Sequence, residues 1–338
     1  MRVGDALSIP YSRRGVVVFA VLVLVIAAVA VITLTAGRLG IELPNLLPAL
    51  LSDPGGKEGF VLGRLRGPRL AVAVATGATL GVAGTLFQTV TRNPLGSPDV
   101  IGLGAGAAAG AAAAGLLWPG VIPIPAGALL GASIAMAAVW LGTGRGFSSP
   151  SRFIIVGIGV SAMGYAFTQY VIARSGREQA TVLASYLNGT LASRSWGDAA
   201  VIWAALAVLL PAALLLGRRL LLIEMGDETA DALGGRSGRT RLLSIAVAVC
   251  LSAAAVSVAG PVAFVALTAP QIARRLGRMA GAGIVLSAAT GALLLATADL
   301  LVQQAPFDVH LPVGILTAAV GGVYLGYLLI REWKKGTI

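Results

Sequence analysis

An acidic segment interrupts the apolar sequence between residues 225 and 234, and its side chains could bind a soluble partner. It contains Asp227, Glu228 and Asp231, its residues favour a helix, and arginines flank it on both sides. A chain with so few charges has little reason to keep such a segment unless the segment faces water. Arginines gather on the cytoplasmic side of membrane helices. The pattern therefore predicts a cytoplasmic docking element for a soluble motor protein.

Patterns typical of catalysis or metal binding are missing from the sequence. Cys250 and His310 are the only residues of their types, so the chain can form neither an internal disulfide nor a histidine cluster. No lysine stands in a Gly-x-x-x-x-Gly-Lys-Ser/Thr phosphate loop. Asp299 is the only acidic residue that does not lie in a loop or at the very end of a predicted helix. It is near the extracytoplasmic end of its helix, which predicts that its side chain caps the helix or contacts water. We therefore expect no catalytic residue, metal or cofactor on this chain, and any driven process must take its energy from another protein.

The composition indicates a membrane protein that crosses the bilayer many times. Of the 338 residues, 57% are hydrophobic and only 12% are charged, against about 25% charged in soluble domains. The net charge of +11 could suggest a nucleic-acid partner. The basic residues, however, lie at the ends of apolar stretches, which favours membrane topology and contact with lipid over nucleic-acid binding.

Apolar stretches recur along the whole chain and predict an all-α fold with about ten transmembrane helices. The stretches cover residues 16–36, 69–90, 98–117, 121–141, 153–173, 199–216, 242–259, 261–272, 283–302 and 311–330. The first is long enough to span the bilayer, so we interpret it as a helix rather than a cleaved signal. The stretch 261–272 is short and must gain length from its neighbours. An even number of helices and the arginine bias place both termini in the cytoplasm.

Three arginines depart from that bias. Arg64, Arg66 and Arg69 crowd the outer end of the second predicted helix. Two interpretations remain open: their long side chains reach the lipid interface, or they form a landing site for acidic residues of an extracytoplasmic partner.

Glycines are frequent within the apolar stretches and predict close helix packing. The chain has 45 glycines, and small residues allow membrane helices to approach closely. The second and third stretches carry a dense set: Gly77, Gly81, Gly84, Gly102, Gly104, Gly106 and Gly110.

Several motifs, in order along the chain, resemble the permeases of ferric-siderophore and vitamin-B12 ABC importers. They are Arg66-Gly67-Pro68-Arg69, Phe87-Gln88, Arg92-Asn93-Pro94-Leu95-Gly96-Ser97-Pro98-Asp99, Gly226-Asp227-Glu228-Thr229-Ala230, Leu233-Gly234, Ala259-Gly260-Pro261, Phe264-Val265-Ala266-Leu267, Ala298-Asp299 and Leu311-Pro312-Val313-Gly314. Together they cover nearly the whole chain. The segments around residues 93–99 and 223–227 and Gln303-Gln304 are most similar to the ferric-enterobactin branch of this family.

The resemblance implies a type II ABC importer permease fold, with residues 1–338 forming one transmembrane permease domain in the plasma membrane. It implies a complex of two permease subunits, two copies of a cytoplasmic ATPase that holds ATP and magnesium, and an extracytoplasmic substrate-binding protein. The implied substrate is a ferric siderophore of the catecholate type. Two alternatives remain: a same-family importer of vitamin B12 or heme, and an ion-coupled secondary carrier that needs no ATPase.

The resemblance also assigns roles to individual residues. A cytoplasmic loop over about 217–241 would couple to the ATPase through Glu224, Met225, Gly226, Asp227, Glu228, Thr229, Ala230, Leu233 and Gly234. Arg66 and Arg69 would dock the substrate-binding protein. The fifth and tenth helices would line the pathway with Tyr165, Thr168, Gln169, Thr317 and Tyr324.

Three positions depart from the family pattern. Gln271 replaces a frequent histidine, Val323 ends a Gly-Gly-Val sequence where Gly-x-Pro is frequent, and Gln303 stands where the B12-type relative has an outward arginine.

Overall fold

Helices make up nearly all of the regular structure in the part of the chain described by the computed structural model, which is residues 2–3, 7–8, 13–37, 39–52, 55–144, 150–176, 186–278, 281–305 and 311–334. The α-helices are α1 (Arg13–Thr35), α2 (Leu43–Leu51), α3 (Gly56–Phe60), α4 (Gly67–Thr91), α5 (Leu103–Ala112), α6 (Ile124–Gly142), α7 (Pro150–Ala173), α9 (Trp196–Glu224), α10 (Asp227–Ala232), α11 (Ser237–Ala259), α12 (Val265–Gly277), α13 (Ile284–Gln304) and α14 (Val313–Lys334). Two π-helical turns (Val61–Leu65 and Ala113–Leu117), a 3-10 turn (Pro98–Ile101) and two paired two-residue strands, β1 (Arg2–Val3) and β2 (Leu7–Ser8), complete the fold. The all-α prediction is confirmed.

Each of the ten predicted stretches coincides with a helix. Seven helical segments in the described residues are long and apolar enough to cross a membrane, and two shorter apolar ones cover Leu103–Leu117 and Val313–Tyr327. The stretch 261–272 differs from expectation. Its helix, α12, has 13 residues and is about 20 Å long, too short to cross the hydrocarbon. Residues 260–263 before it are not helical.

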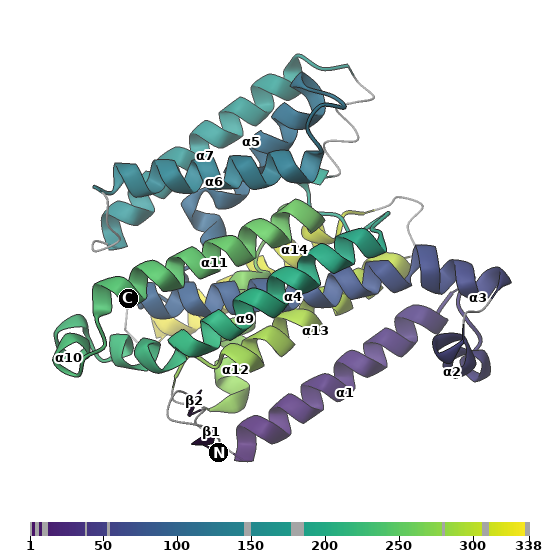
Figure 1. Ribbon diagram of the computed structural model, residues 1–338, viewed down its shortest axis with the longest axis horizontal. Helices are drawn as coiled ribbons and strands as arrows, with labels where there is room; N and C mark the ends of the chain where they lie inside the picture. The colour runs from purple at the N-terminus through teal and green to yellow at the C-terminus, as the bar shows by residue number, and fades with distance from the viewer. Residues whose placement is uncertain are drawn as a thin grey trace.

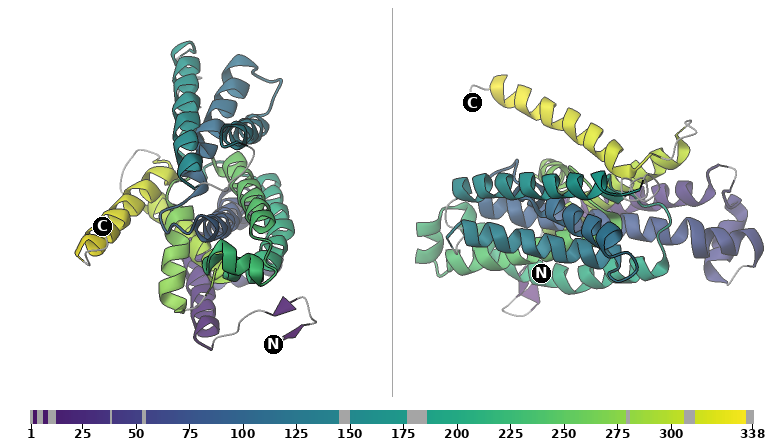
Figure 2. Two further views of the ribbon diagram at one scale, coloured as in Figure 1. Left: turned by 90° about the vertical axis from the view of Figure 1, so that its left-hand side faces the viewer. Right: turned by 90° about the horizontal axis from the view of Figure 1, so that it is seen from above.

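Helix α4 runs through the centre of the bundle (Figure 1), and nearly every residue from Val72 to Val90 is buried. It packs against α9, α11, α12 and α13. Helices α5, α6 and α7 form a layer beside α11, and α1 packs against α13 on the other side. Helix α14 leaves the bundle at an angle (Figure 2). The core is therefore built around α4 and α13.

Helix α10 marks one end of the bundle, and α1 begins and α14 ends toward that same end (Figures 1 and 2). We call it the α10 end and the opposite end the outer end. The start of α4 at Gly67 and the end of α13 at Gln304 lie at the outer end, whereas the end of α4 at Thr91 lies near α10.

The predicted glycine packing is confirmed at most positions. A methyl group on Gly77 would lie 2.2 Å from the carbonyl oxygen of Gly291, and one on Gly81 would lie 2.1 Å from the Ser287 oxygen. On the other layer, a methyl group on Gly110 would lie 2.1 Å from the Gly127 oxygen. Gly104 differs because it faces open space. Backbone-to-backbone contact therefore joins α4 to α13 and α5 to α6.

Candidate functional site

The predicted coupling segment folds into a short helix between two turns. Gly226 precedes α10 with a φ of 110°, and Gly234 follows it with a φ of 77°. Both values lie in the region that glycine adopts readily. Met225 and Leu233, just outside the helix, are 64% and 60% exposed, whereas Ala230 is fully buried against the chain. The segment thus presents an apolar side chain at each end of a compact projecting turn.

Asp227 joins this short helix to two other helices. Its carboxylate accepts hydrogen bonds from Arg241 Nη2 in α11, at 2.9 and 3.0 Å, and it also pairs with Arg92, which caps α4. Arg92 has a left-handed backbone with a φ of 49°. The sequence predicted the charges, but Arg92 lies 135 residues away and its pairing with Asp227 was not predicted.

Asp231 closes the far side of the same turn. Its carboxylate accepts hydrogen bonds from the Ser237 backbone N–H at 2.6 Å and from the Ser237 hydroxyl at 2.8 Å. These two bonds, the backbone bond first, lower the pKa of the Asp231 carboxyl from its ordinary value. The loop is therefore held at both of its ends by a carboxylate, Asp227 at one end and Asp231 at the other.

A network of amides lies beneath this loop. Gln88 Nε2 of α4 donates to the Leu267 carbonyl at 2.9 Å, and Gln271 Nε2 of α12 donates to Gln88 Oε1 at 2.8 Å. Gln271 also donates to the Pro94 carbonyl at 2.9 Å, and Arg274 donates to the same Gln88 oxygen. The departure at Gln271 therefore supplies a donor that joins α12 to the turn after α4.

Residues 92–97 consequently connect two elements. Arg92 ties the turn to α10 through Asp227, and Pro94 ties it to α12 through Gln271. Glu224, the last residue of α9, lies close enough to Arg274 for their charges to attract. Movement of α10 would act on α4 and α12 together.

At the outer end, the two arginines predicted to dock a partner are engaged within the chain. Arg66 is 8% exposed and donates to the Thr33 and Ala36 carbonyls at 2.7 and 2.6 Å. Arg69 pairs with Asp299 at 2.7 Å, and its side chain is 20% exposed. Asp299 was expected to cap a helix or contact water. It is instead 1% exposed and paired with Arg69.

Gln303 lies one helical turn beyond Asp299 and donates to its second oxygen at 2.7 Å. The departure at Gln303 thus gives the Asp299 carboxylate a second donor. In this chain, Asp299 is satisfied by one arginine and one amide.

The residues predicted to line a pathway separate into two groups. Tyr165, 64% exposed, accepts a hydrogen bond from Gln169 Nε2 at 2.7 Å on the exposed face of α7. Thr168 is 5% exposed and donates to the Gly164 carbonyl of its own helix, so its side chain is packed within the chain. In α14, Thr317 is 7% exposed, and the Tyr324 ring lies 5.7 Å from the Arg275 guanidinium. The structure brings together only Tyr165 and Gln169.

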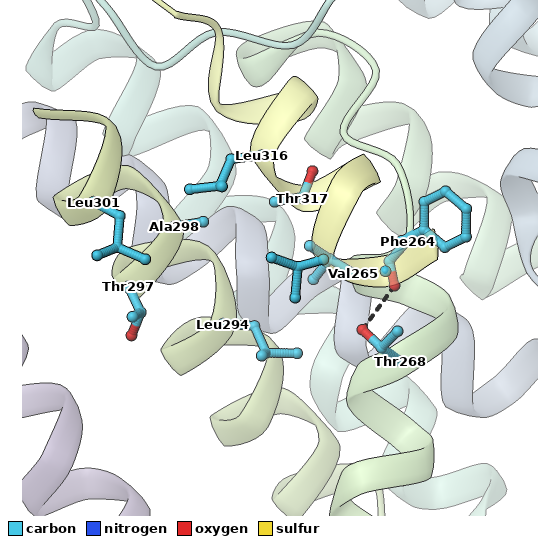
Figure 3. A pocket seen from close by; sticks show the side chains of 11 residues that line it. Phe264, Val265, Thr268, Leu294, Thr297, Ala298, Leu301, Leu316 and Thr317 are labelled. Atoms are coloured by element: carbon cyan, nitrogen blue, oxygen red, sulfur yellow. Dashed lines mark hydrogen bonds between the residues drawn. The ribbon is translucent and has the colours of Figure 1, made fainter. Parts of the chain in front are cut away.

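Thr317 lies beside an apolar cavity of about 120 Å³ between α12, α13 and α14 (Figure 3). Phe264, Val265, Leu294 and Leu316 also line it. This volume is below the roughly 300–1,000 Å³ of pockets for drug-sized ligands, so this cavity cannot hold a large chelate. In the described residues, no cluster of three acidic, cysteine or histidine side chains could hold a metal ion; His310 lies outside them.

Comparison with known proteins identifies the relatives of this chain. Residues 20–331 match the FecCD transport family. The ferric enterobactin transport system permease protein of Escherichia coli is 40% identical over 325 residues, which is 96% of this chain and 98% of that protein. A Fe(3+)-citrate import system permease protein of Bacillus subtilis is 34% identical over 328 residues, with 96% and 98% covered.

A solved structure, described as an inward-facing conformation of a candidate metal-chelate type ABC transporter, superposes on this fold. Its TM-score is 0.82 at 25% sequence identity, and the match covers 93% of this chain and 99% of that one. The family match over nearly the whole sequence, the helical bundle and the solved relative agree. The chain is a multi-span membrane permease that belongs to the FecCD transport family.

Proposed function

We propose that this chain is the membrane-spanning subunit of an ATP-driven importer that carries ferric siderophores, with catecholates of the enterobactin type as the first candidates. The observation that carries the proposal is the connection of α10 to α4 and α11 through Asp227. Such a joint lets a soluble protein that pushes on α10 move the centre of the bundle. The relatives named for ferric enterobactin and ferric citrate support the substrate class.

The energy would come from two copies of a separate cytoplasmic ATPase that holds ATP and magnesium. Met225 and Leu233 are exposed on either side of α10 and are suited to enter an apolar cleft of that subunit. Glu228 and Thr229, which are also exposed, would contact the rim of that cleft. In this arrangement the chain lies in the plasma membrane. The α10 end faces the cytoplasm, and both termini are cytoplasmic.

The pathway would form between two permease subunits, either two copies or this chain and a paralogue. Helix α7 exposes Ile155, Met163 and Tyr165, and α14 exposes Val323 and Tyr327. Apolar faces of this extent on two helices at the edge of the bundle fit an interface with a second subunit. Tyr165 and Gln169 would then face the pathway, and Thr168, Thr317 and Tyr324 would shape it from behind.

A substrate-binding protein would dock at the outer end. Arg69 retains some exposure, so a partner carboxylate can approach it while Asp299 holds it in place. Arg66 would position the end of α1 beside that contact through the Thr33 and Ala36 carbonyls.

Uptake of radioactive ferric enterobactin in cells that lack this gene tests the proposal. Wild type should restore uptake, and Asp227→Lys with Glu228→Lys should abolish it, because the reversed charges repel Arg92 and Arg241. Immunoblots of membranes must show equal amounts of both proteins. Wild-type uptake that continues when the ATPase is inactivated, but stops with a protonophore, would instead establish an ion-coupled carrier.

A further inference from the structure

A groove of about 500 Å³ opens at the outer end between α1, α2, α4 and α9. The groove is separate from the coupling segment. It is also separate from the exposed faces of α7 and α14, because these two helices lie on other sides of the bundle than α1 and α9 (Figure 2). Its lining is mostly apolar and includes Leu34, Leu50, Leu70, Val74, Trp196 and Trp203.

The groove has the depth of one lipid leaflet. Along the segment that leads into α4, its lining runs from Gly59 to Val74, which is about 22 Å at the helical rise. This length is close to half of a bilayer of about 40–45 Å that includes the head groups. Trp196 and Trp203 are 52% and 45% exposed at its side. Tryptophan is enriched where the hydrocarbon meets the head groups. The groove therefore begins in the hydrocarbon and ends at the interface.

Helix α2 lines the groove with Ala49 and Leu50 and has the character of an interfacial helix. It buries Leu46 and Ala49 against the chain and leaves Leu43 and Leu47 65% and 66% exposed. Short amphipathic helices of this kind lie in the plane of the interface, with apolar side chains in the acyl region. The membrane surface therefore lies at the level of α2.

A positive charge directly follows the groove lining in sequence and has no salt bridge in the described part of the chain. Arg64, next to Gly63, is exposed. Arg66 and Arg69 turn into the protein, whereas no salt bridge within the described residues involves Arg64. A guanidinium at the head-group level pairs well with a phosphate.

We propose that the groove binds one phospholipid of the outer leaflet, with an anionic head group favoured. One acyl chain lies in the groove against Trp203 and Val74, because an unfilled gap between lipid-facing helices would lose van der Waals contacts. The phosphate pairs with Arg64. The inference does not depend on the transported substrate, but its assignment to the outer leaflet rests on the orientation given with the proposed function.

The test uses the fluorescence of Trp196 and Trp203 in the full-length protein, with Trp118, Trp140 and Trp333 replaced by phenylalanine. Phosphatidylglycerol with brominated acyl chains is added to the protein in detergent. Saturable quenching is expected, together with one retained phospholipid per chain by native mass spectrometry. Unbrominated phosphatidylglycerol should reverse the quenching better than phosphatidylcholine.

Two variants separate the chain site from the head-group site. A methyl group on Gly63 would meet no atom within 4 Å, so Gly63→Leu adds apolar bulk to the groove lining without a clash at Cβ and should displace the retained lipid. Arg64→Ala should weaken the binding of phosphatidylglycerol about fivefold and should leave the binding of phosphatidylcholine unchanged. Arg174→Ala serves as the control. It removes a charge at the outer end that lies over the Tyr170 ring, away from the groove, and should change the binding of neither lipid.

Two outcomes would overturn the proposal. Unchanged quenching and lipid retention in Gly63→Leu would show that no acyl chain occupies the groove. Unchanged lipid selectivity in Arg64→Ala, with weaker binding of a substrate-binding protein, would assign Arg64 to protein docking. If Gly63→Leu does not fold, the exposed Arg64→Ala change alone decides between lipid and protein.

Discussion

Arg69 binds both carboxylate oxygens of Asp299, with three nitrogen–oxygen distances between 2.7 and 3.0 Å, although 230 residues separate them in sequence. The pair joins the start of α4 to the last part of α13. It lies at the outer end, where Asp299 is almost fully buried.

Asp299→Asn should strongly destabilise the protein. The substitution leaves the Arg69 charge without a counter-ion in a mostly buried position, and breaking one side of a buried pair costs about 3–5 kcal/mol. Thermal unfolding of the purified protein in detergent should show a clear loss of Tm. The double change Arg69→Leu with Asp299→Leu removes both charges and should restore much of that loss. A single change with no effect on Tm would show that the pair does not stabilise the fold.

Gln271→Ala should loosen the turn after α4. The change removes the hydrogen bonds to Gln88 and to the Pro94 carbonyl, which together contribute about 1–3 kcal/mol. Hydrogen exchange of residues 92–97 should become faster, and ATP hydrolysis in the assembled complex should become less dependent on substrate. Gln304→Ala, an exposed amide at the outer end, serves as the control. Equal exchange in both variants would contradict a joining role for Gln271.

Gly77→Ala should destabilise the bundle, whereas Gly104→Ala should be tolerated. The new methyl group would lie 2.2 Å from the Gly291 carbonyl oxygen in the first case and would meet nothing within 4 Å in the second. Overpacking of this kind costs about 1–3 kcal/mol or more. The comparison requires thermal unfolding of both variants under one set of conditions. Similar Tm values would show that α4 and α13 can separate at little cost.

The fold of the coupling loop should respond to acid through Asp231. Hydrogen bonds from Ser237 lower the pKa of this carboxyl in the folded protein. A depressed folded-state pKa adds stability that is fully present above the unfolded pKa of about 3.9 and is lost as the pH falls through the folded value. Hydrogen exchange of residues 231–237, corrected for intrinsic rates, should therefore stay constant from about pH 7 to 5 and rise below about pH 4. Asp231→Asn should lose this dependence, whereas Glu228→Gln should keep it.

The sequence predicted the elements of the fold better than their connections. Long apolar stretches are sufficient to predict spanning helices, and the glycines predicted close helix packing. Which helices meet, such as α4 with α13, was not predicted. The short helices α2 and α3 were not predicted, because they are brief and lie outside any apolar stretch long enough to span. The signal for α2 was the leucine-rich segment between Leu43 and Leu51, with Pro44 in the first turn.

The residue pairs could not be predicted in the same way. Arg69 and Asp299, or Arg92 and Asp227, are brought together by the packing of whole helices, and one sequence contains no information on which distant charges meet. The sequence therefore treated Arg66 and Arg69 as two equivalent surface charges. The structure separates them into a buried arginine that binds the end of α1 and a partly exposed arginine that binds α13.

The backbone contact between Gly77 and Gly291 also determines which helices can move. Two helices that touch without intervening side chains cannot slide or rotate against each other without opening a gap. Helices α4 and α13 then move as one rigid pair, and a transport cycle must displace this pair relative to the α5–α6–α7 layer and α14. Spin labels on α7 and α14 should change their distances to α13 between nucleotide states, while a label pair on α4 and α13 should report one constant distance.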